Sequence, residues 1–557
     1  MKILKTSLYA FFLLAVISFG FVRSQQMDIY REIARSQQQI MTVYKYLLTE
    51  YIHELDVQEL TTRIIDSMLS NFDPYTEYYE QKDLEDLSVK TEGEFSGVGL
   101  EIYMYEDQLT VVSPIEGSPA SRSGIYTGDA IMNIDGVATE GLELKDATSK
   151  IRGKAGTEVI LTIKKPITGE IQDYPIVRDV ITIKDIPFYG MVDDNVGYLR
   201  ITNFSINTAT ETKDAIISLM QEGAGSVVID LRDNPGGLLS SSLDLLDLIL
   251  PKNLDLVSTK GREGKNIKNY QTLNNALIPE SINLAVLING GSASASEIVA
   301  GVLQDHDRAV VLGSQSFGKG LVQTVIGINQ DTALKITNSK YYIPSGRSLQ
   351  KREFIDDELI ANSSAIADSL FQTKAGRTVK GGGGIYPDIV VTDEGSYPLA
   401  AAILRNGAYF KFVQQNSDKY TSIDEVLADP ELLAKFETFI TENDISGYVD
   451  GQEDLRLAKD KLANEDEKNL FMNNAFSVIE KQIQKTQSLM FEDEKKLIQR
   501  VLHGEFAFYY NGYEGRYNLY LKDDKVVLKA LELFADESKY LSILSNSESA
   551  EVALSNN

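Results

Sequence analysis

The sequence contains no cysteine and no tryptophan, and it has only three histidines among 557 residues. The absence of cysteine excludes thiol nucleophiles, disulfide bonds, thiolate metal sites and lipid attachment through an N-terminal cysteine. The histidines, His53, His306 and His503, leave few candidates for a histidine general base. We expect no cofactor and no metal, because no motif for either stands among the remaining residues.

The charge is strongly one-sided, with 81 acidic against 54 basic residues and a formal net charge of −27. Nucleic acid and an anionic membrane surface would both be repelled by such an average surface, so neither is expected as a partner. Protein, neutral or apolar substrates fit better. The length and the 43% hydrophobic content predict about three or four domains with packed cores.

The first 24 residues have the build of a secretory signal: two lysines, then an apolar run from Leu8 to Val22, then polar residues. That run is shorter than the roughly 20 residues of a spanning helix. No clean A-x-A site follows it, so an uncleaved N-terminal anchor stays open, although we favour cleavage near Ser24. The pattern predicts an exported protein, of the bacterial periplasm.

Periodicity divides the rest of the chain into four segments. Residues 25–92 have the apolar spacing of helices. Residues 93–168 change to short β-branched runs with turns, typical of a small β domain. In 169–395 buried strands, LVQTVIGI among them, alternate with helices, which predicts a mainly parallel α/β sheet. Residues 396–557 are helical and highly charged, which favours a packing or oligomerisation domain.

The stretch GGSASASE, from Gly290 to Glu297, follows the apolar run INLAVLIN and precedes a helical pattern. Ser294 and Glu297 fit an S-x-x-E capping box, so the serine could be purely structural. The same turn from a buried strand into a helix also places a serine beside backbone N–H groups that can hold an oxyanion. On this stretch alone, both interpretations stay open.

A serine nucleophile needs a base, and His306 lies at the far end of the helix that Ser294 would begin, roughly 18 Å away. Lys319, flanked by glycines at the end of the next strand, returns to the same sheet edge. Burial would lower its pKa and leave some of it neutral. Gln323, at an even offset in the following strand, would share its face and orient the amine. Without Ser294, Lys319 would be interpreted as a surface lysine.

The segment from Gly291 to Gln323 resembles the active-site segment of the C-terminal processing proteases, serine peptidases with a serine–lysine dyad assisted by glutamine. FDPYTEYY, GEFSGVGLEI, DLRDNPGG, KYYIPSGRSLQ and GGIYPDIVV resemble further signatures of that family, over about residues 40–395. The resemblance implies Ser294 as nucleophile, Lys319 as base and Gln323 as its partner. Ser292 and Ser296 would then serve the turn and the helix cap.

The resemblance also implies the remaining site residues. The amide of Gly236, or of Gly237, would form the oxyanion hole with that of Ala295. The small domain would be PDZ-like, and its loop Gly97-Val98-Gly99-Leu100 would bind a peptide's terminal carboxylate. The core would be a crotonase-like α/β sheet with the PDZ-like domain inserted before it. Arg152 is a candidate for gating the dyad, against the plain alternative of a surface helix arginine.

These expectations describe an exported serine endopeptidase that captures free C-termini of proteins or peptides. Two alternatives stay open: a non-catalytic PDZ-type binding or chaperone module, and a thioester-processing enzyme of the crotonase type. A homo-oligomer also stays open. The run Gly381–Gly384 is interpreted as a hinge or tight turn, because it lacks the lysine and following helix of a phosphate-binding loop.

Overall fold

The computed structural model describes residues 29–105, 108–166, 168–265, 267–351, 353–355, 358–360, 369–392, 395, 397–462 and 470–545. The predicted signal segment, residues 1–24, lies outside them. The chain divides into two compact units, between Tyr78 and Tyr79. In the described residues no helix combines the length and the apolar content that crossing a membrane requires.

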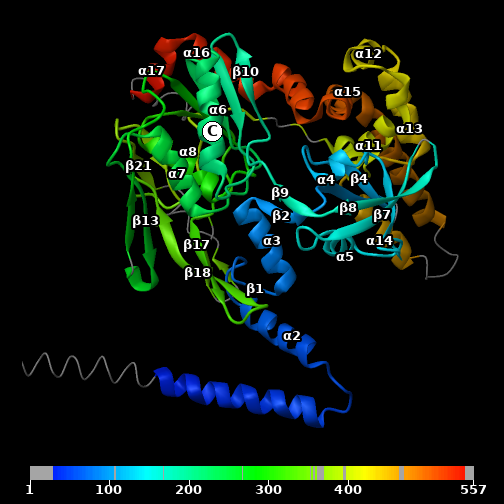
Figure 1. The fold of residues 1–557 in the computed structure, drawn as a ribbon, viewed down its shortest axis with the longest axis horizontal. Coiled ribbons are helices and arrows are strands. Elements are labelled where there is room, and N and C mark those ends of the chain that lie inside the picture. The colour runs from blue at the N-terminus through cyan, green and yellow to red at the C-terminus, as the bar shows by residue number, and fades with distance from the viewer. Residues whose placement is uncertain are drawn as a thin grey trace, which may run out of the picture. The chain divides into compact units, whose positions relative to one another are not determined.

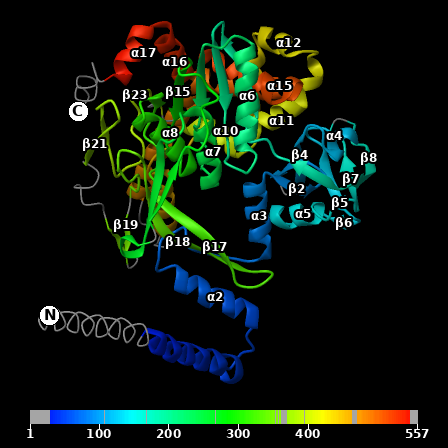
Figure 2. The same ribbon diagram turned by 60° about the vertical axis from the view of Figure 1, so that its left-hand side comes forward.

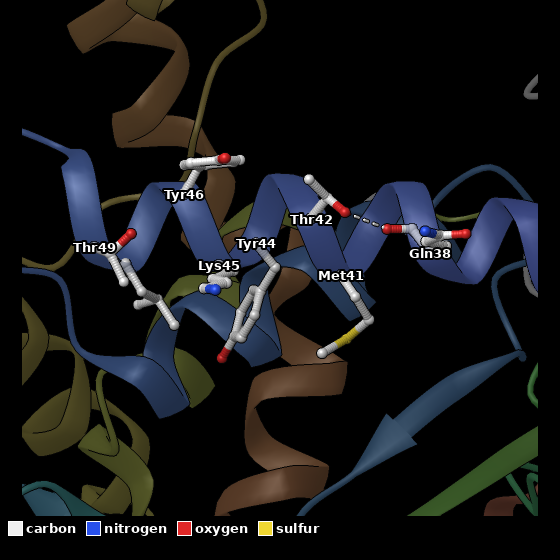
Figure 3. A pocket seen from close by; sticks show the side chains of 8 residues that line it. Gln38, Met41, Thr42, Tyr44, Lys45, Tyr46 and Thr49 are labelled. Carbon is white, nitrogen blue, oxygen red and sulfur yellow. Dashed lines mark hydrogen bonds between the residues drawn. The ribbon is translucent and has the colours of Figure 1, made fainter.

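The first unit is helical, as predicted from its periodicity. One helix covers residues 29–50, and α2 (Val57–Leu69) follows, capped by Asp56, whose carboxylate accepts from the N–H of Glu59 at 2.7 Å. The Tyr44 hydroxyl lies 2.9 Å from the Thr61 hydroxyl and so joins the two helices. Figure 3 shows Met41 and Tyr44 on one side of the first helix and Tyr46 on the other. The strand β1 (Glu77–Tyr79) ends this part of the chain.

The PDZ-like domain is a β sheet with helix α5 packed on it (Figure 2). Strands pair in the order β3-β4-β5-β7-β8, which leaves β3 at an edge, and α3 leads into the domain. Ala147 and Ile151 of α5 are buried against the sheet. The elements are α3 (Gln81–Glu92), β2 (Glu94–Gly97), β3 (Leu100–Tyr105), β4 (Gln108–Pro114), α4 (Pro119–Arg122), β5 (Ala130–Ile134), β6 (Val137–Ala138), α5 (Leu144–Ile151), β7 (Glu158–Lys164), β8 (Ile171–Val177) and β9 (Asp179–Thr182).

The core sheet has the strand order β10-β11-β12-β15-β16-β23, and all of its pairings are parallel except that of β10 with β11. The predicted strands and helices of this region form at the expected places, because each strand is a near-continuous apolar run bounded by turns. Its elements are β10 (Phe188–Asp193), β11 (Val196–Arg200), α6 (Thr208–Gln221), β12 (Ser226–Asp230), α7 (Leu239–Ile249), β15 (Asn283–Ile288), α8 (Ala295–Asp305), β16 (Val310–Gly313) and β23 (Ile389–Val390).

Both faces of this sheet are covered, by helices from different parts of the chain (Figure 1). Alternate strand residues such as Ile229 and Val286 pack with α6, α7 and α8 on one face. Val228 and Leu287 point to the other face and pack with Val527 and Leu533 of the C-terminal helices. The near-continuous apolar strands predicted a sheet covered on both faces, but not that this second layer would be formed by α16 (Lys525–Ala535) and α17 (Glu537–Leu544).

The strand LVQTVIGI exists, but the prediction that it belongs to the parallel sheet is wrong. It forms β17, which pairs antiparallel with β18 in a separate sheet and is exposed over its second half. An apolar run by itself does not specify its partner, and the partner here is the next segment of the chain. This sheet and two small hairpins contain β13 (Asp255–Gly261), β14 (Lys268–Gln271), β17 (Leu321–Gly327), β18 (Ala333–Tyr342), β19 (Glu353–Ile355), β20 (Glu358–Ile360), β21 (Leu370–Gln372) and β22 (Thr378–Lys380).

The C-terminal helices pack around their own aromatic core, in which Phe412, Phe436 and Phe506 are buried. The buried carboxylate of Glu494 accepts from the N–H groups of Leu399 and Ala400 and so caps the first of these helices. The helices are α10 (Pro398–Arg405), α11 (Ala408–Asn416), α12 (Ile423–Ala428), α13 (Leu432–Glu442), α14 (Gln452–Leu462) and α15 (Leu470–Tyr520), the last with a kink at Gly512.

Candidate active site

Three loops meet at the carboxyl edge of the core sheet. They follow the adjacent parallel strands β12, β15 and β16, and they carry Gly236, Ser294 and Lys319 respectively. Binding sites of open α/β sheets lie at this edge. The strand order therefore places the three predicted site segments side by side.

Ser294 lies at the turn from β15 into α8, half-buried, with φ 53° and ψ −111°. A non-glycine residue with positive φ is strained, and such strain persists only where the surroundings hold it in place. Part of the predicted capping box is formed, because the N–H of Ser294 donates to Glu297 Oε2 at 2.9 Å. The serine thus begins the helix in a conformation that is unusual for a plain cap.

The loop after β12 is bonded directly to the start of α8. Ser292 Oγ donates to the carbonyl of Leu231 at 2.8 Å, and Ser296 Oγ donates to the carbonyl of Asn234 at 2.9 Å. The N–H of Ala293 donates to the same Asn234 carbonyl at 3.0 Å. The two serines that flank Ser294 therefore fasten the glycine loop to the turn.

The backbone of Gly236 packs closely against the turn that contains Ser294. A Cβ atom added there would lie 2.8 Å from Ser294 Cβ and 2.9 Å from the nitrogen of Ala295, and φ is +98°. Only glycine fits such an approach. The structure thus brings together the two predicted oxyanion residues, but the N–H of Gly236 donates to Asn234 Oδ1 at 2.9 Å. Its neighbour Gly237 is exposed, with φ 152°.

Asp230, the last residue of β12, anchors the base of the glycine loop. Its buried carboxylate accepts from the Tyr198 hydroxyl at 2.7 Å and from the guanidinium groups of Arg200 and Arg232. Burial by itself would raise the pKa of Asp230, but the two arginines hold it at about 2. The carboxylate is therefore ionised, and it orders the start of the loop.

Lys319 lies in the loop between β16 and β17 and is half-buried. Its N–H donates to Glu297 Oε2 at 2.9 Å, the oxygen that also accepts from Ser294. The hydroxyl of the buried Tyr341 donates to the carbonyl of Lys319 and lies 3.4 Å from the carbonyl of Ser294. The backbones of the predicted nucleophile and base are therefore adjacent.

The run Gly381–Gly384 was predicted to be a hinge or tight turn. In the structure it also packs against the lysine loop and Glu297. A Cβ on Gly384 would lie 2.6 Å from Ser316 Oγ and 2.9 Å from Glu297 Oε1. A Cβ on Gly318 would in turn lie 3.3 Å from the backbone of Gly383. The glycines let the backbone of this run approach the lysine loop closely.

Gln323 lies in β17, and its Nε2 donates to Thr337 Oγ1 across the hairpin at 3.2 Å. Lys319 precedes the strand, and a bulge shifts the register between Val322 and Gln323. Strand alternation therefore does not put Lys319 and Gln323 on one face, because period-2 geometry does not extend from residue 319 to 323. The role predicted for Gln323 rests on the family resemblance alone.

His306 lies at the far end of α8, where its Nε2 is 2.7 Å from the carbonyl of Asp255. The eleven residues of α8 separate it from the serine turn. It is therefore remote from Ser294, as the helix length predicted.

The loop Gly97–Leu100 lies at the start of the edge strand β3. The carbonyls of Val98 and Gly99 accept from the N–H groups of Ala120 and Ile115, both at 2.9 Å. Because a trans peptide is planar, the next N–H in each case points the opposite way. The amides of Gly99 and Leu100 thus point away from these bonds, at the start of the edge strand β3.

Arg152 ends α5 and is three-quarters buried. Its Nη1 donates to Asp86 Oδ1 of α3 at 2.9 Å, and its guanidinium lies 5.3 Å from the centre of the Phe95 ring. Two further ion pairs, Lys82–Asp146 and Lys145–Asp83, join α3 to α5. The arginine is thus part of a contact between the PDZ-like domain and the helix that precedes it.

Sequence reasoning identified Glu297 only as a helix cap. Its bonds to the lysine loop were missed, because they come from residues about 20 positions later in the chain. Tyr341 was missed for the same reason. The only local signal was the glutamate of the S-x-x-E box itself.

Three family models match the chain, and each covers one part of the fold. They are a PDZ domain over residues 86–164, peptidase family S41 over residues 195–360, and the C-terminal helical domain of a probable PDZ-protease over residues 399–534. The second match contains all three loops of the sheet edge. The third contains most of the helices that follow the core.

Curated relatives agree with these matches. A carboxy-terminal-processing protease of Bartonella bacilliformis is 38% identical over 341 residues, which are 60% of this chain and 77% of the relative. A probable CtpA-like serine protease of Staphylococcus aureus is 33% identical over 349 residues, 62% of this chain and 69% of the relative. Among solved structures, a photosystem II D1 C-terminal processing protease is 24% identical, with a TM-score of 0.35, covering 64% of this chain and 87% of that one.

The fold, the sheet-edge site and the matched models together define a serine-type peptidase with a PDZ domain and an α/β core. The chain belongs to the carboxy-terminal-processing proteases of peptidase family S41. The PDZ domain makes peptides and proteins its expected binding partners.

Proposed function

We propose that the chain is an exported endopeptidase that binds the C-terminal tail of a protein in its PDZ domain and cleaves the protein through an acyl-enzyme at Ser294. The observation that carries this proposal is the shared carboxylate oxygen: Glu297 Oε2 accepts at 2.9 Å from the amides of both Ser294 and Lys319. Because of these two bonds, the backbones of the serine and of the candidate base are held against the same carboxylate.

In the proposed mechanism the neutral amine of Lys319 takes the proton of Ser294 Oγ as this oxygen attacks the scissile carbonyl. The resulting oxyanion is held by the N–H of Ala295 and by an amide of the Gly236–Gly237 pair. Gly236 can contribute once the Asn234 side chain releases its N–H. Lys319 then returns the proton to the leaving amine, and water hydrolyses the acyl-enzyme. Gln323 orients the lysine amine.

The PDZ domain has a proposed route to this site, through Arg152. Arg152 bonds to α3, and the last carbonyls of α3, those of Lys90 and Glu92, accept from the side-chain amides of Asn203 and Asn207. Within that same loop the N–H of Phe204 donates to the carbonyl of Gly236 at 3.2 Å. A tail that moves α5 would therefore bias the glycine loop, which supports a gating role for Arg152.

Export is proposed from the N-terminal sequence, with its two lysines and apolar run. The relatives are bacterial, and the proposed destination is the bacterial periplasm. N-terminal sequencing of the protein recovered from cells would show whether cleavage occurs near Ser24 or whether the segment stays as an anchor.

The mechanism is tested with purified protein and a model substrate that carries an apolar C-terminal tail. Ser294→Ala and Lys319→Ala should each abolish cleavage, and the double variant should be little worse, because residues of one relay are not additive. His306→Ala should keep near-normal activity. Substantial activity in Lys319→Ala would rule out the dyad.

A further inference from the structure

Glu297 is fully buried, and its carboxylate accepts four hydrogen bonds from two segments of the chain. Oε2 accepts from the N–H groups of Ser294 and Lys319, each at 2.9 Å. Oε1 accepts from Ser316 Oγ at 2.6 Å and from the N–H of Gly318 at 2.7 Å. A capping box requires only the bond from the N–H of Ser294, so capping of α8 does not account for the other three bonds.

The three additional bonds cross from α8 to the lysine loop. The amides of Ser294 and Lys319 share one oxygen, so they can be no farther apart than two 2.9 Å hydrogen bonds placed end to end. These bonds connect the two elements of the proposed dyad directly, and they are strongest once the carboxyl, whose pKa burial raises to about 7, is ionised. Lys319 Nζ can reach Ser294 Oγ only while the backbones keep this spacing.

The surroundings of Glu297 make this arrangement sensitive to the carboxylate. Three of its four partners are backbone N–H groups, which can only donate. The fourth, Ser316 Oγ, is already an acceptor for the N–H of Ile385. A neutral amide in place of the carboxylate would direct an NH₂ group at these donors. At least one bond to the lysine loop would then be lost.

We propose that Glu297 is a positioning residue for the peptidase reaction, which clamps the turn of Ser294 and the loop of Lys319 to one another. This inference rests on the proposed function. Beyond that function, the inference is that the buried carboxylate of Glu297, which is neither nucleophile nor base, sets the distance between Ser294 and Lys319. The backbone of Gly384 also packs closely against this carboxylate, since a Cβ added there would lie 2.9 Å from Glu297 Oε1.

The test compares Glu297→Gln in the full chain with Glu494→Gln. Glu494 is a matched control, because it too is buried and accepts from two N–H groups at a helix start, in the helical domain. Hydrogen exchange read by mass spectrometry should show faster exchange in segments 292–297 and 316–320 of Glu297→Gln only. With a tailed substrate, kcat should fall by roughly ten- to a hundredfold, the scale of a displaced reacting group, while KM stays within about twofold.

The two readouts separate the clamp from the proposed function. Faster exchange in both segments, in a chain whose wild type cleaves no tailed substrate, would support the clamp and refute the peptidase mechanism. If the wild type cleaves and Glu297→Gln keeps its kcat within about twofold, the clamp is overturned. Should Glu297→Gln not fold, Glu297→Asp replaces it. It keeps the charge but draws the carboxylate back by one methylene, and the same losses are expected.

Discussion

Arg232 and Asp524 lie 292 positions apart in the chain and form a two-pronged ion pair, with Arg232 Nη1 at 2.9 and 3.1 Å from the two carboxylate oxygens of Asp524. Arg232 stands at the start of the glycine loop that reaches Ser294. Asp524 stands at the start of α16, which covers the second face of the core sheet. The pair therefore links the candidate active site to the last helices of the chain.

Asp524→Ala should destabilise the protein through the loss of a helix cap and of the ion pairs with Arg232 and, at 3.9 Å, with Arg500. The carboxylate also caps α16 by accepting from the N–H groups of Val526 and Val527, a contribution of about 1 kcal/mol. Loss of the largely buried partner of Arg232 adds to this cost. Thermal unfolding should show a larger drop in Tm than for Asp536→Ala, which removes only the cap of α17. Equal drops would mean that the ion pair contributes nothing.

Gly236→Ala should abolish peptidase activity, because its Cβ would collide with Ala293 O at 2.7 Å and with the turn of Ser294. Gly223→Ala is the matched control. Its φ of +101° is close to the +98° of Gly236, and nothing lies within 4 Å of the added Cβ. Both variants pay the strain of positive φ, about 1–2 kcal/mol. If activity falls equally in both, the strain and not the collision is responsible.

A free carboxylate on the substrate tail should strengthen binding to the PDZ domain. Amidation removes a charge-assisted bond of roughly 1.5–3 kcal/mol, so the Kd measured on a Ser294→Ala background should rise by about ten- to a hundredfold. Gly99→Ala, whose Cβ would lie 2.2 Å from Ser118 Cβ, should erase this difference. Gly124→Ala, with a similar φ and open space, should preserve it. Equal affinity of acid and amide for the unmodified loop would remove Gly97–Leu100 from recognition.

Arg152→Ala should lower kcat while leaving tail affinity nearly unchanged, since the proposed route through α3 acts on the glycine loop and not on the tail. Lys145→Ala serves as control, because it breaks an exposed ion pair between the same two helices. Steady-state kinetics and tail binding on the Ser294→Ala background decide the matter. A raised KM with unchanged kcat would make Arg152 a substrate contact, and no change in either would leave it structural.

The pH dependence of stability should report the buried carboxyl of Glu297. Burial raises its pKa from 4.5 to about 7, although its hydrogen bonds act in the opposite direction. Between those pH values the folded protein holds a proton that the unfolded chain has released, so stability should decrease as pH rises from 4.5 to 7. Glu297→Gln lacks this proton. The Tm of the wild type, relative to that of Glu297→Gln, should therefore decline over this range; parallel curves would contradict the assignment.

Much of the candidate site was predictable from local patterns. The apolar runs of β12, β15 and β16 identified three strands, and the loops that follow them placed Ser294 and Lys319 at one sheet edge, whereas Gly236 was predicted from the family resemblance. The S-x-x-E box located the start of α8. These predictions succeed because strand periodicity, helix caps and strand-end loops depend on residues close together in the chain.

Local residue patterns were enough to predict which segments become strands and helices, and they put a serine, a lysine and a glycine loop at the ends of strands. Contacts between distant segments specify that LVQTVIGI leaves the parallel sheet, that the helices after Asp524 cover its second face, and that Glu297 holds the lysine loop as well as its own helix. Periodicity specifies what a segment buries, whereas the partner that buries it is chosen among all distant segments by packing and hydrogen bonding.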